Sequence, residues 1–297
     1  MSDNQFARRL TSITELPKKG DLLLISDQQK DGIKITGSTI ATSSFLRLGL
    51  MNAEFTDCDF TQSNFEDSYF RKAKFKNVRL TGSTFRFCNF DKAIFQGCDL
   101  RYCSFYHCKL PCDEMIACLP REPKLRRDLA RNLRANYEML GDMKSADVFL
   151  DIEIAADDEE QKSILFSKSS YYKERYTIPS RISAGIKFCV SKISGLVWGY
   201  GRRVSRLLFS FILITALCSF ITFFLGINFS EVGQTTPHLL SLWESIYFTF
   251  GVTLGMSSGT SLVPITFSGK LLVLFENFLG TLFLALLAAT IYRRIAR

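Results

Sequence analysis

The side chains that catalysis most often uses are scarce in this chain. Only two histidines, His107 and His238, occur among 297 residues, which disfavours a zinc enzyme or a Ser-His-Asp hydrolase. Several cysteines gather around His107 at spacings that superficially suit a metal ion: Cys98, Cys103, Cys108 and Cys112. No constellation of nucleophile, base and acid is recognisable, so we expect no enzyme activity, no catalytic residues, no cofactor and no metal site.

A different chemistry, the binding of ions by backbone carbonyls, is open to the segment that follows Thr253. Residues 254–264, Leu-Gly-Met-Ser-Ser-Gly-Thr-Ser-Leu-Val-Pro, are rich in Gly, Ser and Thr and lie between apolar stretches. Non-helical backbone at bilayer depth is tolerated only where it is buried in protein or lines water. In such a place its carbonyls can replace the hydration shell of a cation.

Two apolar stretches on either side of this segment are long enough to hold it in a membrane. Residues 207–229 carry no charged side chain, and residues 270–292 carry only Lys270 and Glu276. At ~1.5 Å per residue each stretch matches the thickness of a bilayer core. Basic residues flank the pair only on the outer sides: Arg202, Arg203, Arg206, Arg293, Arg294 and Arg297. The positive-inside rule therefore predicts two transmembrane helices with both termini in the cytoplasm.

The connection between the two spans contains a helix that is too short to cross a bilayer. Ser241-Leu-Trp-Glu244 matches a capping box, which marks the start of a helix. The helix predicted over residues 241–253 is only about 18 Å long. It must therefore dip into the membrane and return through residues 254–264.

This order of span, re-entrant helix, irregular loop and span resembles the two-transmembrane pore domain of potassium channels, here residues 207–297. The resemblance implies a selectivity filter made of Thr253, Leu254, Gly255, Met256 and Ser257. It also implies that Glu276 and Gly280 support the pore, that four copies share one axis, and that a monovalent cation, K+, is the permeant ion. Two spans cannot enclose a pore alone, so a homo-oligomer, a tetramer by resemblance, is expected in the lipid bilayer.

The filter departs from the family pattern Thr-Val-Gly-Tyr-Gly-Asp. Met256 stands at the tyrosine position and Ser257 at the second glycine, and Pro264 follows Thr253 by eleven residues instead of eight. Glycine allows the filter backbone to aim successive carbonyls at the ion, and serine adopts such angles less readily. These departures fall on the outer ion sites of the filter, whereas Thr253, Leu254 and Gly255 can still offer carbonyls and a hydroxyl. Glu276 has two readings, as a brace for the filter backbone or as an interfacial acid near the start of its helix.

The N-terminal half carries a period of five residues. The apolar positions are Ile35, Ile40, Phe45, Leu50, Phe55, Phe60, Phe65, Phe70, Phe75, Leu80, Phe85, Phe90, Phe95, Leu100, Phe105 and Leu110, and a small residue lies two positions before most of them. This period fits neither a helix nor a flat strand. It resembles the pentapeptide-repeat family over residues 33–112, which implies a right-handed quadrilateral β-helix with four repeats per coil.

Charge and packing limit what this β-helix does. Some proteins of the family imitate DNA and protect topoisomerases, which requires an acidic rod. Residues 35–110 carry ten Lys or Arg and seven Asp or Glu, a net charge of +3, so DNA mimicry is disfavoured and no nucleic-acid partner is expected. The repeat also explains the cysteines, because Cys98, Cys103 and Cys108 occupy the small inward position.

Between the β-helix and the spans the sequence predicts helices. Residues 1–32 form an N-terminal segment, and residues 113–180 a cytoplasmic helical hairpin or linker whose second helix runs from Met143 to about Ala156, before an exposed acidic turn, Asp157 to Glu160. The hairpin either packs on the end of the β-helix or contacts other subunits. Residues 181–206 combine an apolar face with basic residues and Trp198, which predicts an amphipathic helix in the membrane interface.

These expectations combine into a mixed β and α membrane protein: an N-terminal pentapeptide-repeat β-helix, a helical linker and a C-terminal two-helix pore domain with a re-entrant loop. The leading hypothesis is an oligomeric cation channel of the potassium-channel type. The whole arrangement resembles a group of bacterial channel-like proteins, which implies the bacterial inner (plasma) membrane. The alternative is a membrane-anchored scaffold whose pore is degenerate and whose β-helix recruits a cytoplasmic partner or ligand.

Overall fold

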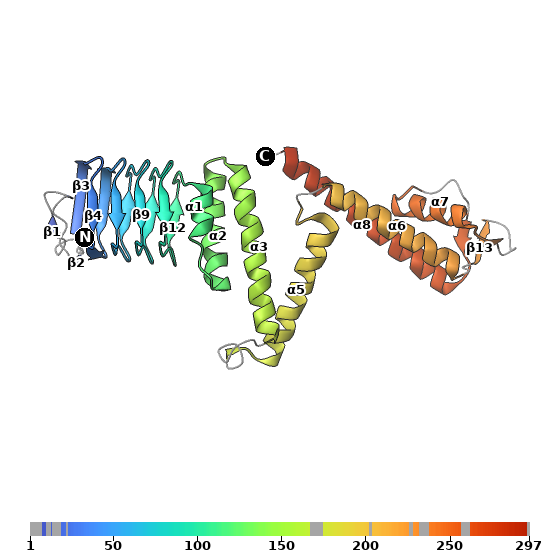
Figure 1. The fold of residues 1–297 in the computed structure, drawn as a ribbon. Coiled ribbons are helices and arrows are strands. Elements are labelled where there is room, and N and C mark those ends of the chain that lie inside the picture. Colours follow the sequence, from blue (N-terminus) through green and yellow to red (C-terminus); the bar gives the residue numbers. More distant parts are fainter. Residues whose placement is uncertain are drawn as a thin grey trace, which may run out of the picture. The chain divides into compact units, whose positions relative to one another are not determined.

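The computed structural model describes residues 8–9, 13, 19–21, 23–166, 175–201, 204–225, 228–231, 238–256 and 262–295. The chain forms two compact units, Met1–Gly185 and Ile186–Arg297. Each has its own cluster of buried apolar side chains, and Figure 1 shows the course of the chain through both.

The first unit begins with a β-solenoid of short parallel strands. Its strands are β1 (Arg8–Arg9), β2 (Lys19–Asp21), β3 (Leu23–Gln29), β4 (Lys34–Thr36), β5 (Thr39–Ala41), β6 (Ser44–Gly49), β7 (Glu54–Thr56), β8 (Asn64–Glu66), β9 (Lys74–Lys76), β10 (Thr84–Arg86), β11 (Ile94–Gln96) and β12 (Ser104–Tyr106). They build sheets ordered β1-β3-β6-β8-β10-β12, β11-β9-β7-β4 and β2-β5. From β2 onward each strand pairs with the strand 20 residues away, as Phe65 does with Phe85. The predicted β-solenoid with four five-residue repeats per turn is confirmed.

A corner in every repeat makes this short period feasible. Every fifth residue from Asp27 to His107 has a positive φ, between 50° and 72°, and most of these residues are not glycine. A left-handed residue costs roughly 1–2 kcal/mol when it is not glycine. The chain accepts this cost at each corner because the corner turns the next large side chain inward. Nine of these seventeen positions hold Gly, Asn or Asp, the residue types that adopt a left-handed backbone most readily, and the others hold larger side chains such as Phe87 and His107.

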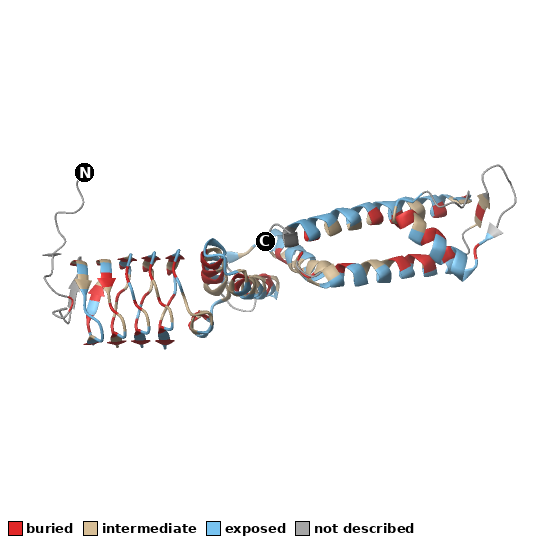
Figure 2. Ribbon diagram, turned by 90° about the horizontal axis from the view of Figure 1, so that it is seen from above, coloured by how far each residue is buried: buried red, intermediate tan, exposed pale blue. Residues whose placement is uncertain are grey.

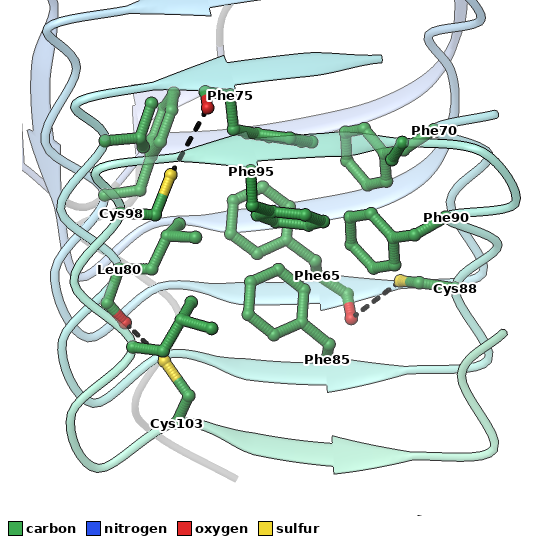
Figure 3. Packing of buried hydrophobic residues seen from close by; sticks show 14 of the residues in the cluster. Phe65, Phe70, Phe75, Leu80, Phe85, Cys88, Phe90, Phe95, Cys98 and Cys103 are labelled. Carbon is green, nitrogen blue, oxygen red and sulfur yellow. Dashed lines mark hydrogen bonds between the residues drawn. The ribbon is translucent and has the colours of Figure 1, made fainter. Parts of the chain in front are cut away.

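Stacked phenylalanine rings fill the interior of the solenoid (Figure 3). Rings 20 residues apart lie nearly parallel, with centroids 4.9 Å apart for Phe70 and Phe90 and 4.8 Å for Phe75 and Phe95. This spacing matches the distance between neighbouring strands, so one turn of the coil adds one ring to each stack. All the predicted apolar positions from Ile35 to Phe105 are buried, and Leu110 packs against them in part. Figure 2 shows how buried and exposed residues alternate along the coils.

The cysteines of the solenoid serve packing and local hydrogen bonding. The thiol of Cys98 lies 3.4 Å from the carbonyl oxygen of Phe75, and that of Cys103 lies 2.9 Å from the carbonyl oxygen of Leu80, each 23 residues earlier. Burial raises the pKa of both thiols to about 12, so neither forms a thiolate at neutral pH. No group of three potential ligands is placed to hold a metal ion in the part of the chain that the structure describes.

Helices close the end of the solenoid. They are α1 (Cys112–Ala117), α2 (Pro123–Met139) and α3 (Met143–Phe166). The side-chain oxygens of Asn132 and Asn136 accept hydrogen bonds from the backbone amides of Phe105 (2.7 Å) and Cys108 (2.8 Å). The amide group of Asn136 also donates to the Cys108 carbonyl at 2.8 Å. These side chains take the place of a further coil. Of the two alternatives for the hairpin, the structure shows the packing on the end of the β-helix.

The predicted acidic turn at Asp157 to Glu160 is wrong, because α3 continues through it to Phe166. Arg127 of α2 pairs with Asp157 at 3.0 Å and with Glu160, whose side chain is buried. A buried carboxylate is tolerable only with such a partner. The acidic residues therefore hold α3 against α2 and do not end the helix.

The second unit contains helices and one small antiparallel sheet. Helix α5 (Ile178–Trp198) enters it at Ile186 and is followed by α6 (Val204–Phe224), α7 (Leu242–Thr253) and α8 (Phe267–Ile295). Strands β13 (Asn228–Glu231), β14 (His238–Leu239) and β15 (Leu262–Pro264) pair in the order β14-β13-β15. Helix α6 and residues Phe267–Tyr292 of α8 are long and apolar enough to cross a membrane.

Several predicted boundaries differ from the structure. The β-helix was expected to start at residue 33, but β2 and β3, inside the predicted N-terminal segment 1–32, already pair with β5 and β6. The first span was expected to continue to residue 229, but α6 ends at Phe224 because Asn228–Glu231 pairs with β15 as a strand. The interfacial helix was expected over residues 181–206, but α5 ends at Trp198, and Gly199, Tyr200 and Gly201 follow with positive φ. The apolar side chains of α5 are largely exposed: Ile182, Ile186, Val190 and Ile193.

We predict that Phe70→Ala lowers the free energy of unfolding by about 3–5 kcal/mol. The substitution leaves a cavity among the stacked rings, and the neighbouring side chains cannot move in to fill it. Phe87→Ala is the matched control: the Phe87 side chain is 56% exposed and stacks only on His107, so its loss should cost about 1 kcal/mol or less. The measurement is denaturant unfolding of the solenoid followed by circular dichroism. Equal losses in the two variants would contradict the internal ladder.

Candidate functional site

The candidate site is built around α7, the short helix between the two long apolar helices. Ser241 caps its start: the Ser241 hydroxyl accepts from the Glu244 amide at 3.4 Å, and the Ser241 amide donates to the Glu244 carboxylate at 2.8 Å. The predicted capping box is confirmed. Twelve residues of helix cannot span a bilayer, so α7 ends inside the unit at Thr253.

The C-terminal end of α7 carries the residues predicted as a selectivity filter. The Thr253 hydroxyl donates to the carbonyls of Thr249 (2.8 Å) and Phe250 (3.1 Å), so it is engaged within the helix. Leu254 continues the last turn, and Gly255 has φ +67°, a left-handed conformation with open space around it. Met256 is 66% exposed and its amide donates to the Gly251 carbonyl at 3.0 Å. Ser257 lies outside the described residues.

Gly280 of α8 lies directly against this end of α7. A Cβ atom added to Gly280 would lie 1.7 Å from the Thr253 carbonyl oxygen and 2.5 Å from its carbonyl carbon. Only a glycine permits this approach of the two backbones. The structure thus brings together two residues that the resemblance assigned to the filter and to its support.

Glu276 lies on α8, one helical turn before Gly280. Phe248 and Val252 of α7 pack in one cluster with Leu272 and Val273 of α8, so the two helices run alongside each other from that cluster to the Thr253–Gly280 contact. Glu276 is fully buried, which does not fit an acid exposed at the membrane interface. Among the described residues neither of its carboxylate oxygens has a hydrogen-bond partner.

Two hydroxyls of α7 share this condition. Ser245 and Thr249 are fully buried, and their side-chain oxygens also lack a partner among the described residues. The hydroxyls of α6 differ, because Ser219 and Thr222 donate to the carbonyls four residues earlier, at 2.9 and 3.0 Å. Buried polar groups without partners are rare and call for a reason. Glu276, Ser245 and Thr249, which we name the buried polar group, are therefore the most unusual feature of the unit.

Sequence reasoning singled out Glu276 but missed its companions on α7. The signal was available, since Ser245, Thr249 and Thr253 recur every four residues on an otherwise apolar helix and thus share one face. The close approach at Gly280 was not readable from the sequence, because it depends on which helix lies opposite.

Comparison with known proteins identifies the first unit. Residues 48–119 match the family described as "Pentapeptide repeat region". Together with the observed fold, this match shows that the N-terminal part is a pentapeptide-repeat β-solenoid. No curated protein matches the chain.

Several solved structures align with part of the chain. Two are trypsin-treated forms of QnrB1, a plasmid-mediated fluoroquinolone resistance protein: one is 18% identical with a TM-score of 0.22 and covers 35% of this chain and 58% of that one. The second is 22% identical with a TM-score of 0.16, covering 31% and 56%. Full-length QnrB1 is 15% identical with a TM-score of 0.12, covering 30% and 75%. The chain thus spans little more than half the length of the first two, and nothing of their activity is carried over to it.

We predict that Gly280→Ala destabilises the second unit by about 1–3 kcal/mol, because the new methyl group forces α8 away from Thr253. Ala285→Val adds methyl groups to an exposed position of the same helix and is the control. The measurement is the midpoint of thermal unfolding in detergent. Unchanged midpoints for Gly280→Ala would show that the backbones do not touch.

Proposed function

We propose that the chain is one subunit of an oligomeric cation channel of the potassium-channel type, with a cytoplasmic pentapeptide-repeat domain. The observation that carries the proposal is the end of α7 at Thr253 against Gly280, between two helices long enough to cross a membrane. A helix that stops at bilayer depth needs a watered axis or protein around the backbone that follows it. A pore shared by several copies provides both.

In this proposal the backbone after α7 binds the ion. The C-terminal end of a helix carries partial negative charge, which favours a cation on the axis. The filter comprises Thr253, Leu254, Gly255, Met256 and Ser257, and the permeant ion is K+. Because one chain supplies only two spanning helices, the pore requires a homo-oligomer, four copies by resemblance, in the bacterial inner membrane.

Glu276 has a defined task in this proposal. A buried carboxylate with no partner among the described residues is unfavourable unless neighbouring groups donate hydrogen bonds to it. We therefore assign Glu276 the task of bracing the filter-like loop, with Ser245 and Thr249 on the facing helix.

The sequence departures at Met256 and Ser257 support a second candidate, a membrane-anchored scaffold with a non-conducting pore. Ion flux separates the two. We predict that purified full-length chain in planar bilayers conducts monovalent cations, with a reversal potential that favours K+ over Na+.

The matched variants for this prediction are Gly255→Ala and Gly141→Ala. Both glycines have φ near +70° with nothing close to the missing side chain, so the intrinsic backbone strain of alanine is the same. Gly255→Ala should change conductance or selectivity, whereas Gly141→Ala, in the α2–α3 turn, should leave both unchanged. Absence of current under all conditions, also after removal of residues 1–166, would favour the scaffold.

The bracing role of Glu276 predicts whether its substitution by leucine lowers or raises the stability of the protein. If Glu276 accepts hydrogen bonds from the loop, Glu276→Leu leaves those donors unsatisfied and lowers stability by about 1–3 kcal/mol. If it has no partner, the same substitution removes a buried charge and raises stability. We expect Glu276→Leu to lower the stability and to make the current decay faster. Asn277→Leu, at the exposed neighbouring position, should change neither the stability nor the current. Thermal unfolding in detergent and single-channel recording measure the two effects, and a more stable Glu276→Leu protein would exclude the brace.

A further inference from the structure

The second unit contains a cavity that neither span nor filter explains. It has a volume of about 460 Å³, within the range of small-molecule sites, and lies among α5, α6, α8 and the end of α7. Its walls include Ile214 of α6, Leu286 of α8 and the Thr253–Gly280 contact. Phe211 and Phe283 also line it and stack with centroids 4.0 Å apart, which joins α6 to α8.

The chemistry of the walls selects an apolar occupant. Four hydroxyls line the cavity. Three of them donate to backbone carbonyls, and the fourth, that of Ser194, accepts a hydrogen bond from the indole of Trp198. Ser210 donates to Val197 (2.8 Å) and Leu207 (2.9 Å), and Thr215 donates to Phe211 (2.9 Å). The Thr253 hydroxyl is engaged in the same way within α7. Away from Ser194 and Trp198, an occupant therefore finds apolar contacts and hydroxyls whose protons are already engaged, which suits a hydrocarbon chain and disfavours water or an ion.

One end of the cavity is amphipathic. Trp198 lines it, and its indole N–H donates to the Ser194 hydroxyl. Arg206, adjacent to the lining residue Leu207, donates to the Gly195 carbonyl at 3.2 Å and has no carboxylate partner within the described ranges. Arg202 and Arg203 stand beside it in the sequence. An unpaired guanidinium with an aromatic residue at the start of an apolar helix is the setting in which anionic lipid headgroups are held.

We propose that this cavity binds one acyl chain of an anionic phospholipid, whose phosphate pairs with Arg206. The apolar body of the cavity takes the chain, and the basic end takes the headgroup. The bound chain touches the backbone at Thr253 and Gly280, so its presence fixes the distance between α6 and α8 beneath the end of α7. The site does not depend on conduction, since a non-conducting membrane scaffold would bind the same lipid.

The test is photolabelling of the full-length chain in nanodiscs that contain phosphatidylglycerol with a photoactivatable acyl chain. Ile214→Trp fills the cavity, and Leu213→Trp places the same bulk on the exposed face of α6, where the leucine is 60% exposed. We expect label on cavity-lining peptides of α6 and α8 in the wild type, about tenfold less in Ile214→Trp and no change in Leu213→Trp. Leu286→Trp fills the cavity from the opposite wall and replaces Ile214→Trp if that variant fails to fold.

The headgroup is tested separately. Arg206→Gln should reduce labelling by phosphatidylglycerol severalfold and leave labelling by a zwitterionic phosphatidylcholine analogue unchanged. Equal labelling of Ile214→Trp and wild type, or label spread evenly over the exposed face of α6, would overturn the proposal. Cross-links between the α8 helices of two copies across the cavity would overturn it as well, because the cavity would then be a subunit interface. Ion flux plays no part in these readouts, so failure here and failure of the channel proposal are distinguishable.

Discussion

The requirement that backbone amides and carbonyls removed from water be hydrogen-bonded shapes both units. In the solenoid the backbone of each coil forms hydrogen bonds with the coil 20 residues away. At the last coil the side chains of Asn132 and Asn136 accept the hydrogen bonds that the backbone of a further strand would have accepted. In the second unit the long helices satisfy themselves internally, which is the condition for crossing a bilayer. Among the described residues the side chains of the buried polar group, Glu276, Ser245 and Thr249, do not meet the same requirement, because their oxygens have no hydrogen-bond partner.

The second unit combines the buried polar group with a close backbone contact, and the two differ in what they can do. The Thr253–Gly280 contact fixes the position of the end of α7 through backbone atoms, which no side-chain motion can relax. Glu276 and Thr249 lie one helical turn from this contact and Ser245 lies two turns from it, and the described residues leave all three side chains without hydrogen-bond partners. In the proposed channel, the rigid backbone contact and the nearby side chains without hydrogen-bond partners would together hold the loop after α7 in one conformation. A filter made of carbonyls needs such a fixed loop. The cavity also borders this contact, and in our proposal a lipid acyl chain fills it.

The parts that the sequence allowed us to predict are those governed by local or strictly periodic rules. The five-residue period located the solenoid core from Ile35 to Phe105, and the Ser241–Glu244 spacing located the start of α7. The predictions fail where the structure of a segment depends on a partner that is distant in the sequence. Asp157 to Glu160 look like a solvated turn until Arg127 of α2 pairs with Asp157 and Glu160. Asn228 and Phe229 look like the end of a span until their strand pairs with β15. Gly280 was noticed for its place in a resemblance, whereas its close approach to Thr253 depends on three-dimensional packing alone.

The same 20-residue offset organises the surface of the solenoid. Glu54 lies between Lys34 and Lys74, Arg79 pairs with Asp59 at 2.9 Å, and Arg71 pairs with Asp91 at 3.1 Å, so charges of opposite sign face each other on successive coils. Such exposed pairs contribute only about 0–1 kcal/mol each to stability, but they cancel the field of the rod at a distance. A polyanion mimic requires rows of like charge, and these rows alternate. The basic run from Arg71 to Arg79 is partly neutralised in the same way. The exposed corners differ from these paired charges, because the aromatic side chains of Phe87 and Tyr102 project there, 56% and 68% exposed.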